Sequence, residues 1–237
     1  MLDFLIEIDT KLFLALNDLH LPFFDYFMKA FTGKIIWAPM YSVILFILYR
    51  RFGWKVATTY VIGIVLAIAL ADQICASYIR PFVERLRPSN LANPIHSEVH
   101  IVDGYRGGQY GFPSCHAANS FALATFCSFL FASRRFTCFI FGWAILNSYS
   151  RLYLGVHYPG DLIIGALVGS SIAAIVYCGS RYVAQKISHP RSYYFKSVNG
   201  SLEIGSKSVP YHLADIMILV GCTTSALILV YSFIAWV

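Results

Sequence analysis

Residues 150–161 read SRLYLGVHYPGD and join two apolar runs, Phe136–Leu154 and Leu162–Gly179. Each run is close in length to the roughly 20 apolar residues that an α-helix needs to cross a bilayer. The junction itself contains a hydroxyl, a guanidinium, an imidazole and a carboxylate. We therefore interpret it as the meeting point of two membrane helices at which polar chemistry is concentrated.

The order of residues in this junction favours a helix that begins just before the carboxylate. Pro159 suits the first turn of a helix, where its missing N–H is not needed, and Asp161 then lies where the helix dipole stabilises negative charge. His157 precedes this carboxylate by four residues, so Asp161 is expected to bind one imidazole nitrogen and to leave the other basic. Arg151 offers a planar fork of donors that matches a phosphate.

The composition indicates a membrane protein. The chain of 237 residues is 58% hydrophobic and 13% charged, which is less charge than a soluble domain uses to cover its surface. Strands exposed to lipid would leave backbone groups unpaired, so the apolar runs are expected to be helices. The sequence predicts an all-α polytopic protein with a bundle of six transmembrane helices. The other four predicted spans are Ile35–Tyr49, Val56–Tyr78, Ala117–Ser133 and Leu213–Val237.

Residues 1–32 are not apolar enough to span a bilayer. Apolar residues recur there at helical spacing and face Asp3, Glu7 and Lys11 on the opposite side, until Pro22 ends the pattern. This pattern is typical of a helix that lies in the membrane interface. The apolar stripe consists of Phe4, Ile8, Leu12, Ala15, Leu16 and Leu19.

The whole chain, 1–237, is expected to form a single membrane domain. Interfacial helices occupy 1–32, the core that carries the chemistry occupies 35–180, a polar loop on the cytoplasmic side occupies 181–211, and the last transmembrane helix occupies 212–237.

The net charge of +6 does not indicate nucleic-acid binding, because the sequence has no basic helix or long basic run. Arginines and lysines instead occupy short loops between spans, at 50–55 and 134–135, and the 181–211 loop. The positive-inside rule places these loops in the cytoplasm. The 79–115 loop and the 150–161 junction then face the other, non-cytoplasmic side, which is the periplasm if the chain belongs to a bacterial inner membrane.

Two further segments with polar chemistry lie at the same predicted membrane boundary as the junction. One is the exit of the second span, residues 80–88, which read RPFVERLRP. The other is the entrance of the third span, residues 113–116, which read PSCH. Ser114 is a good N-cap there, and a helix start with free N–H groups attracts anions.

Together the three segments resemble the type 2 phosphatidic acid phosphatase family of membrane lipid phosphatases. The family pattern is Lys-x6-Arg-Pro, then Pro-Ser-Gly-His, then Ser-Arg-x5-His-x3-Asp. The chain departs from it at Arg80, where the family has lysine, and at Cys115, where the family has glycine. The matching positions are Arg87, Pro88, Pro113, Ser114, His116, Ser150, Arg151, His157 and Asp161.

The resemblance implies how a phosphate ester would be cleaved. His157 would be the nucleophile that forms a phosphohistidine, and Asp161 would orient it. His116 would protonate the oxygen of the leaving group. These three residues are the predicted catalytic group.

The resemblance also implies how the phosphate would be held. Arg80, Arg87 and Arg151 would clamp it, and Ser114 would help. Three guanidiniums can stabilise the equatorial oxygens of the transition state, so neither a metal ion nor a cofactor is expected.

Other readings of these residues stay open. His157 and Asp161 form a structural cap pair if they act alone, and Arg80 can anchor the chain to headgroups by snorkelling. His96, His100 and Asp103 either extend the site, bind a metal or are merely solvated. Asp72 precedes Arg80 by eight residues and can brace it.

The sequence therefore predicts an integral membrane phosphatase that acts on a lipid phosphate in the bilayer. The glycine-rich stretch 105–112 resembles the corresponding part of lipid-A-phosphatase-like relatives, which favours lipid A. Undecaprenyl diphosphate and phosphatidylglycerol phosphate are alternative substrates. A lipid phosphotransferase and a transporter are rival functions, although a transporter would place its charges near the bilayer midplane.

Overall fold

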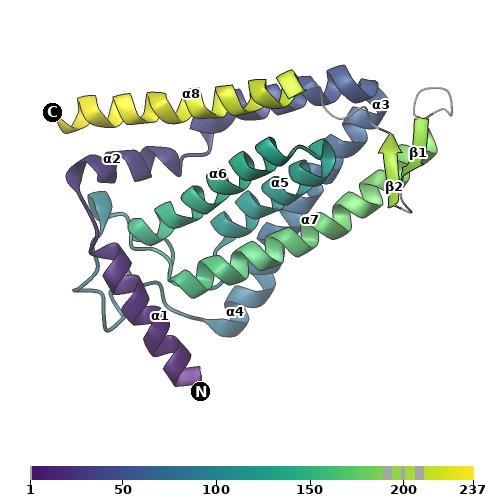
Figure 1. The fold of residues 1–237 in the computed structure, drawn as a ribbon. Helices are drawn as coiled ribbons and strands as arrows, with labels where there is room; N and C mark the ends of the chain where they lie inside the picture. Colours follow the sequence, from purple (N-terminus) through teal and green to yellow (C-terminus); the bar gives the residue numbers. More distant parts are fainter. Residues whose placement is uncertain (1, 189–193, 199–200, 206–210) are drawn as a thin grey trace.

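The computed structural model describes residues 2–188, 194–198, 201–205 and 211–237. It is a helical bundle, as predicted, with one short antiparallel strand pair at one end (Figure 1). The elements are α1 (Leu2–Asn17), α2 (Pro22–Phe31), α3 (Ala38–Gln73), α4 (Arg80–Val83), α5 (Cys115–Phe131), α6 (Arg134–Tyr153), α7 (Pro159–Ile187), β1 (Tyr194–Val198), β2 (Ser201–Gly205) and α8 (Tyr211–Trp236), with a π-helical segment at Ile74–Ile79 and 3₁₀ turns at Ile35–Trp37 and Val102–Gly104.

The first two predicted spans form the two legs of α3. The backbone leaves helical geometry at Gly53, where φ is 69° and ψ is 165°, a conformation that glycine adopts without strain. The hydroxyls of Tyr49 and Thr58, one on each side of this break, lie 3.2 Å apart. The chain therefore turns back near the α3 label in Figure 1, and the loop predicted at 50–55 is reduced to a break at a single glycine.

Among the residues that the structure describes, three helices are long and apolar enough to cross a membrane: Ile35–Val83, Pro159–Ile187 and Leu213–Trp236. The helix Cys115–Phe131 is apolar but shorter. α6 has the length of a span, but Arg134, Arg135 and Arg151 at its two ends make it more polar. The structure thus confirms an integral membrane protein, while the count of six spans remains a prediction.

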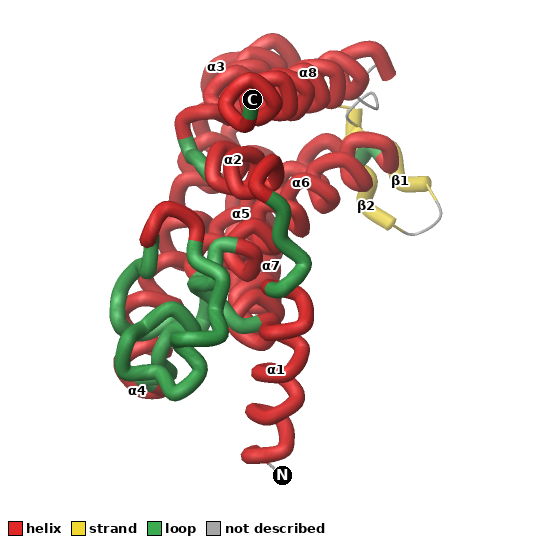
Figure 2. Tube along the Cα trace, turned by 90° about the vertical axis from the view of Figure 1, so that its left-hand side faces the viewer, coloured by secondary structure: helices red, strands yellow, loops and turns green. Residues whose placement is uncertain are grey.

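The N-terminal region forms two helices: α1 ends at Asn17, and α2 begins at Pro22, the residue at which the apolar pattern was predicted to end. The amide nitrogen of Asn17 donates to the backbone oxygen of Tyr153 at 2.9 Å and so ties the end of α1 to the end of α6. Phe13 packs edge-on against Tyr158, with 5.2 Å between the ring centroids. The beginning of α1 extends away from the bundle with an exposed apolar face that includes Phe4 (Figures 1 and 2).

Glycines bring α5 and α7 into close contact. A Cβ at Gly165 would lie 2.4 Å from the backbone oxygen of Ser114, and one at Gly169 would lie 2.0 Å from that of Ala118. Small residues four apart let two membrane helices approach closely. This crossing fixes the start of α5 against the first turns of α7.

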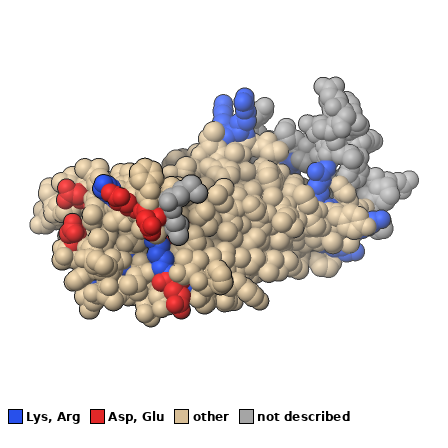
Figure 3. All heavy atoms as spheres, turned by 90° about the horizontal axis from the view of Figure 1, so that it is seen from below, with Lys and Arg blue, Asp and Glu red and all other residues tan. Residues whose placement is uncertain are grey.

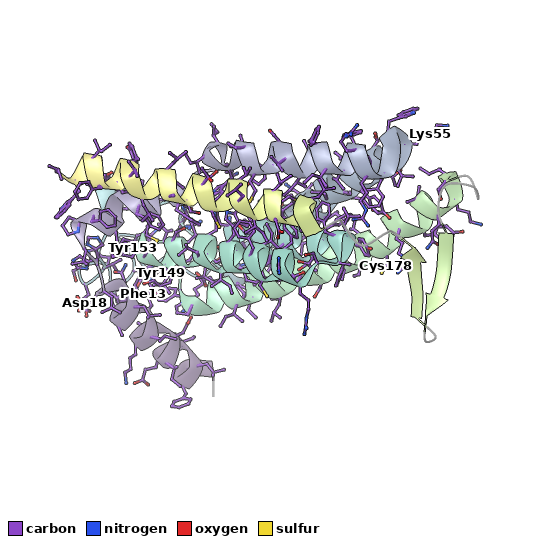
Figure 4. The ribbon with its side chains drawn as sticks, turned by 45° about the horizontal axis from the view of Figure 1, so that its top comes forward. Phe13, Asp18, Lys55, Tyr149, Tyr153 and Cys178 are labelled. Atoms are coloured by element: carbon purple, nitrogen blue, oxygen red, sulfur yellow. The ribbon has the colours of Figure 1, made fainter. Side chains whose placement is uncertain are left out.

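The two ends of the bundle differ in the charges of their side chains. Asp18 and Tyr153 lie at one end, and Lys55 and Cys178 lie at the other (Figure 4). On the face shown in Figure 3, the acidic side chains gather toward one end, and the charged side chains visible among the described residues at the opposite end are Lys and Arg. This separation agrees with the predicted placement of the basic loops opposite the chemistry.

α7 continues past the predicted span Leu162–Gly179 to Ile187, so this helix extends into the first part of the predicted 181–211 loop. Residues 180–187 contain no proline or glycine that would end the helix. Within the predicted loop, β1 at 194–198 pairs antiparallel with β2 at 201–205. The remaining parts of the predicted loop, 189–193, 199–200 and 206–210, lie outside the described residues.

Candidate active site

The three segments identified in the sequence meet at one end of the bundle, where the long loops gather (Figure 2). Arg80 donates from Nη2 to the backbone oxygen of Pro113 at 3.0 Å, which joins the first segment to the second. The backbone N–H of Ser114 donates to the backbone oxygen of Asp161 at 3.0 Å, which joins the second to the third. Residues far apart in the sequence thus form one site.

His157 is held in one tautomer by two charged neighbours. Its Nε2 lies 2.9 Å from Nη1 of Arg87, and its Nδ1 lies 3.2 Å from Oδ2 of Asp161. A guanidinium can only donate, so we assign Nε2 as the unprotonated acceptor and Nδ1–H as the donor to the carboxylate. This arrangement matches the prediction that Asp161 binds one nitrogen and leaves the other basic.

Burial keeps His157 neutral. The residue is 3% exposed, and burial lowers the pKa of its imidazole to about 4, with the positive charge of Arg87 acting in the same direction against the opposing pull of Asp161. A neutral imidazole with a free lone pair is the form that attacks an electrophile.

Asp161 is fully buried and is held by several donors. The backbone N–H of Tyr158 donates to Oδ2 at 3.0 Å, and Nη1 of Arg85 donates to Oδ1 at 3.2 Å. The same Nη1 lies 2.7 Å from Oδ2 of Asp9 in α1. Asp9 also accepts from the backbone N–H of Gly160 through Oδ1 at 2.8 Å, so the N-terminal helix contacts the site directly.

Three arginines surround this pair and carry unused donors. Arg87 and Arg151 are 8% and 6% exposed. In each of Arg80, Arg87 and Arg151 the Nε is buried and has no hydrogen-bond partner among the described residues. Burial lowers the pKa of Arg87 to about 10, and the charges of the other two arginines add to this effect. A phosphate would supply both the negative charge and the acceptors that such a cluster needs.

Arg151 is positioned by residues outside the three segments. Its Nη1 donates to Oγ1 of Thr32 at 3.3 Å, and its Nη2 donates to the hydroxyl of Tyr105 at 3.1 Å. Burial favours the neutral phenol of Tyr105, but the hydrogen bond from Arg151 and the positive charges outweigh it and lower the tyrosine's pKa. The end of α2 and the glycine-rich stretch therefore both contribute to the site.

The glycine-rich stretch passes directly against the reacting groups. A Cβ at Gly111 would lie 3.1 Å from Oδ2 of Asp161 and 3.1 Å from Cγ of Arg87. Gly107 has φ of +70°, and a Cβ there would lie 3.3 Å from the guanidinium of Arg87. Larger side chains at these two positions would push against the arginine and the carboxylate.

Ser114 and His116 lie at the start of α5. Ser114 is fully buried, and its hydroxyl accepts from the backbone N–H of Ala117 at 3.4 Å, so it is the predicted N-cap. His116 lies beside the arginine cluster, with Nε2 3.3 Å from the backbone oxygen of Thr32. Because this oxygen can only accept, we assign a proton to Nε2 of His116.

The other candidate residues have separate partners. Asp72 accepts from Nδ2 of Asn119 at 2.9 Å instead of bracing Arg80, because Arg80 turns toward the 113–116 segment. His100 pairs with Asp25 at 3.0 Å. His96 contacts the backbone of Asn93, and Asp103 binds Lys29. Among the described residues, no three His, Cys, Asp or Glu side chains form a group that could hold a metal ion.

The sequence pattern did not identify Asp9, Arg85, Thr32 and Tyr105 as parts of the site. Arg85 and Tyr105 stand inside segments that were singled out, but without a role. Asp9 and Thr32 carry no sequence signal, since their partners Arg85 and Arg151 are 76 and 119 residues away.

Comparisons with known proteins show which family the chain belongs to. A family model described as the PAP2 superfamily matches residues 60–184. The Lipid A 4'-phosphatase of Bacteroides thetaiotaomicron is 49% identical over 234 residues, which cover 99% of both chains. The Lipid A 4'-phosphatase of Porphyromonas gingivalis is 36% identical over 74% of both chains. The crystal structure of Aquifex aeolicus LpxE has the same fold, with a TM-score of 0.53 over 70% of this chain and 93% of that one at 24% identity.

Proposed function

The chain belongs to the PAP2 superfamily, and from this premise we propose that it is an integral membrane phosphatase that removes the 4'-phosphate of lipid A. The choice of substrate rests on one observation: nearly the whole chain is similar to a protein named Lipid A 4'-phosphatase. The buried His157–Asp161 pair within three arginines supports the chemistry.

The phosphate binds first to the arginine cluster. We propose that Arg80, Arg87 and Arg151 each turn a buried Nε–H and its neighbouring donors toward the phosphate oxygens. Arg87 must then move its Nη1 away from Nε2 of His157, because the lone pair that accepts this hydrogen bond is the one that attacks phosphorus. Substrate binding would thus free the Nε2 lone pair of His157 for attack.

The reaction then proceeds in two displacements. Nε2 of His157 attacks phosphorus, a nitrogen–phosphorus bond forms, and the bond from phosphorus to the sugar oxygen breaks. His116 gives the leaving oxygen its proton, and Asp161 stabilises the positive charge that develops on His157. A water molecule then loses a proton to His116 and attacks the phosphohistidine, which releases inorganic phosphate and restores both histidines.

The bound phosphate also prepares His116 for its role. In the free protein His116 lies near the positive charge of Arg151, which disfavours a second positive charge. A phosphate dianion between them would reverse that balance and favour the imidazolium that can donate a proton.

We place this chemistry on the periplasmic side of a bacterial inner membrane. The proposal includes six spans, formed by the two legs of α3, by α5, α6 and α7, and by α8. The exposed apolar residues at the start of α1 support its placement in the membrane interface.

Purified protein in detergent should test the proposal against a panel of lipid A, undecaprenyl diphosphate and phosphatidylglycerol phosphate, with EDTA present. We expect phosphate release from lipid A, inhibition by vanadate, and a product that mass spectrometry identifies as lacking the 4'-phosphate. His157→Gln serves as the inactive control. Faster phosphate release from undecaprenyl diphosphate or phosphatidylglycerol phosphate would show that lipid A is not the preferred substrate. Activity that depends on one added divalent ion would contradict the metal-free mechanism.

A further inference from the structure

The ring of Tyr105 borders the phosphate site and has no role in the mechanism above. The tyrosine is 48% exposed, whereas Arg87, Arg151 and His157 are all buried. Its hydroxyl accepts from Nη2 of Arg151 at 3.1 Å, and the guanidinium carbon of Arg151 lies 5.4 Å from the centroid of the ring. One side chain thus contacts the buried arginine and also presents an aromatic surface outside the site.

The backbone around Tyr105 is fixed by hydrogen bonds. The N–H of Tyr105 donates to the backbone oxygen of Val102 at 3.0 Å. The hydroxyl of Ser89 donates to the backbone oxygen of Arg106 at 2.7 Å, and Nη1 of Arg106 donates to the backbone oxygen of Ser89 at 2.7 Å. Together with the bond from Arg151, these contacts hold the ring in place before a ligand arrives, which lowers the entropy that binding costs.

Glycines leave room beside this ring. A Cβ at Gly104 or at Gly108 would meet no atom of the described residues within 4 Å, its chain neighbours aside. A Cβ at Gly107 would instead lie 3.3 Å from the guanidinium of Arg87. The stretch that carries Tyr105 therefore packs one side against the arginine cluster and borders open space elsewhere.

Tyr105 and the proposed acid lie on two sides of Arg151. Nη2 of Arg151 binds Tyr105, and Nη1 binds the hydroxyl of Thr32, whose backbone oxygen lies 3.3 Å from Nε2 of His116. The oxygen that His116 protonates is bonded directly to the sugar of the proposed substrate. A phosphate on Arg151 with its leaving oxygen toward His116 therefore brings that sugar beside Arg151, where the ring of Tyr105 is exposed.

An aromatic ring and a sugar ring have complementary surfaces. The face of an aromatic ring carries partial negative charge, and the C–H groups on the face of a pyranose carry partial positive charge. A glycerol or polyprenyl chain offers no such flat face of C–H groups. A sugar therefore gains more than either chain does from a fixed aromatic ring next to the phosphate.

We propose that the sugar ring that bears the phosphate stacks on the ring of Tyr105, and that this contact selects sugar phosphates over glycerol phosphates. The inference rests on the proposed function and deepens it, because it names a residue that recognises the headgroup beyond the phosphate. The two parts of the side chain then have separate roles. The hydroxyl positions Arg151, and the ring binds the sugar.

Two lipids with the same pair of acyl chains test the stacking: a diacylated glucosamine 4-phosphate and phosphatidic acid. The quantity measured is the ratio of kcat/KM for the sugar lipid to kcat/KM for the glycerol lipid. Wild type should favour the sugar lipid, and Tyr105→Leu should lower the ratio by about three- to tenfold, the range expected for one aromatic contact. Because both values come from one preparation, a loss of folded protein does not change their ratio.

Further variants separate the ring from the hydroxyl. Tyr105→Phe should lower kcat/KM for both lipids by a similar factor, because Arg151 loses a partner, and should keep the wild-type ratio. Tyr105→Trp should also keep the preference for the sugar lipid. Tyr182→Leu is the matched control, since it makes the same chemical change at a 61% exposed tyrosine of α7, one turn beyond Cys178 at the opposite end of the bundle (Figure 4).

The outcomes distinguish this inference from the proposed function. A ratio that Tyr105→Leu leaves unchanged, in an enzyme whose wild type hydrolyses the sugar lipid, would overturn the stacking and leave the phosphatase intact. An equal fall of the ratio in Tyr105→Phe and Tyr105→Leu would assign the selectivity to the hydroxyl and overturn the role of the ring. If wild type hydrolyses phosphatidic acid and not the sugar lipid, the proposed substrate fails first and this inference fails with it.

Discussion

Nη2 of Arg80 lies 2.9 Å from the sulfur of Cys115, so the two positions at which the chain departs from the family pattern are in contact. The same Nη2 donates to the backbone oxygen of Pro113 at 3.0 Å. A lysine at position 80 would lack the planar fork, and a glycine at position 115 would lack the sulfur acceptor. The two residues that depart from the family pattern therefore contact each other, in an interaction that the family residues could not make.

This contact predicts that the two substitutions toward the family pattern are coupled. Arg80→Lys alone and Cys115→Gly alone should each lower kcat/KM on lipid phosphate by about tenfold, and the double variant should lose less than the product of the two, as for residues in contact. Steady-state kinetics of the four proteins at one pH measure the coupling. Losses that simply multiply would show that the two positions act independently.

Arg85 and Asp9 are predicted to set the basicity of His157 through Asp161. Arg85→Gln removes a positive charge from beside the carboxylate, so the pKa of His157 should rise and the acid limb of kcat should move to higher pH. Asp9→Asn removes a negative charge from Arg85 and should move that limb to lower pH.

The control for this pair is Glu7→Gln, because Glu7 lies on the same helix in an exposed pair with Lys11. Glu7→Gln should leave the acid limb of the kcat profile at the same pH as in wild type. Shifts of the same sign for Arg85→Gln and Asp9→Asn would indicate a purely structural role for both residues.

The buried neutral His157 predicts how stability depends on pH. Its pKa is lowered from 6.5 to about 4 by burial, so the unfolded chain binds the proton first as the pH falls. The stability contributed by the neutral imidazole is complete above pH 6.5 and is lost as the pH falls toward 4. The melting temperature of detergent-solubilised wild type should fall across this window, and His157→Gln should reduce the slope. An equal slope in both proteins would assign the loss to other groups.

The sequence predicted the residues of the site whose spacing is local. His157 and Asp161 are four residues apart across the start of one helix, so the spacing alone places the carboxylate next to the ring. Ser114 as an N-cap is equally local. The contacts of Asp9 and Thr32 depend on how the N-terminal helices pack on the bundle, and no periodicity encodes that.

The sequence also located the helices but not all of their ends. The hydropathy of 35–49 and 56–78 identified two spans, whereas the conformation of Gly53, which joins them into α3, depends on backbone geometry at one residue. The hydropathy of 162–179 identified a span, and α7 continues beyond it to Ile187, because a helix can extend past the apolar run that crosses the bilayer.

Labelling can test the side of the membrane on which the site lies. In a background with the exposed Cys138, Cys178 and Cys222 replaced by alanine, Ser97→Cys lies in the loop of the site and Lys55→Cys lies at the opposite end of the bundle (Figure 4). An impermeant maleimide added to spheroplasts should label the first cysteine directly and the second only after lysis, because the basic loop belongs in the cytoplasm. The reverse pattern would place the site in the cytoplasm.

The two histidines are predicted to respond differently to the leaving group. His116 carries its proton on Nε2, toward the backbone of Thr32, and is proposed to protonate the leaving oxygen. A sugar alkoxide needs that proton and p-nitrophenolate needs it much less, so His116→Ala should lower kcat on lipid phosphate by about 10²- to 10⁴-fold and on p-nitrophenyl phosphate far less.

His157 presents the unprotonated Nε2 and is proposed to form the covalent bond to phosphorus, so His157→Ala should abolish turnover of both substrates. Labelled substrate and an alkaline quench should trap an alkali-stable, acid-labile phosphoprotein in wild type, since a phosphohistidine hydrolyses in acid and survives base. His116→Ala should keep this species, because attack at phosphorus does not use His116, provided that the substrate carries the good leaving group. If the phosphoprotein forms in His157→Ala and is absent in His116→Ala, then His116 is the nucleophile and His157 is the acid. The hydrogen bond from His157 to Asp161 would then orient the acid instead of the nucleophile.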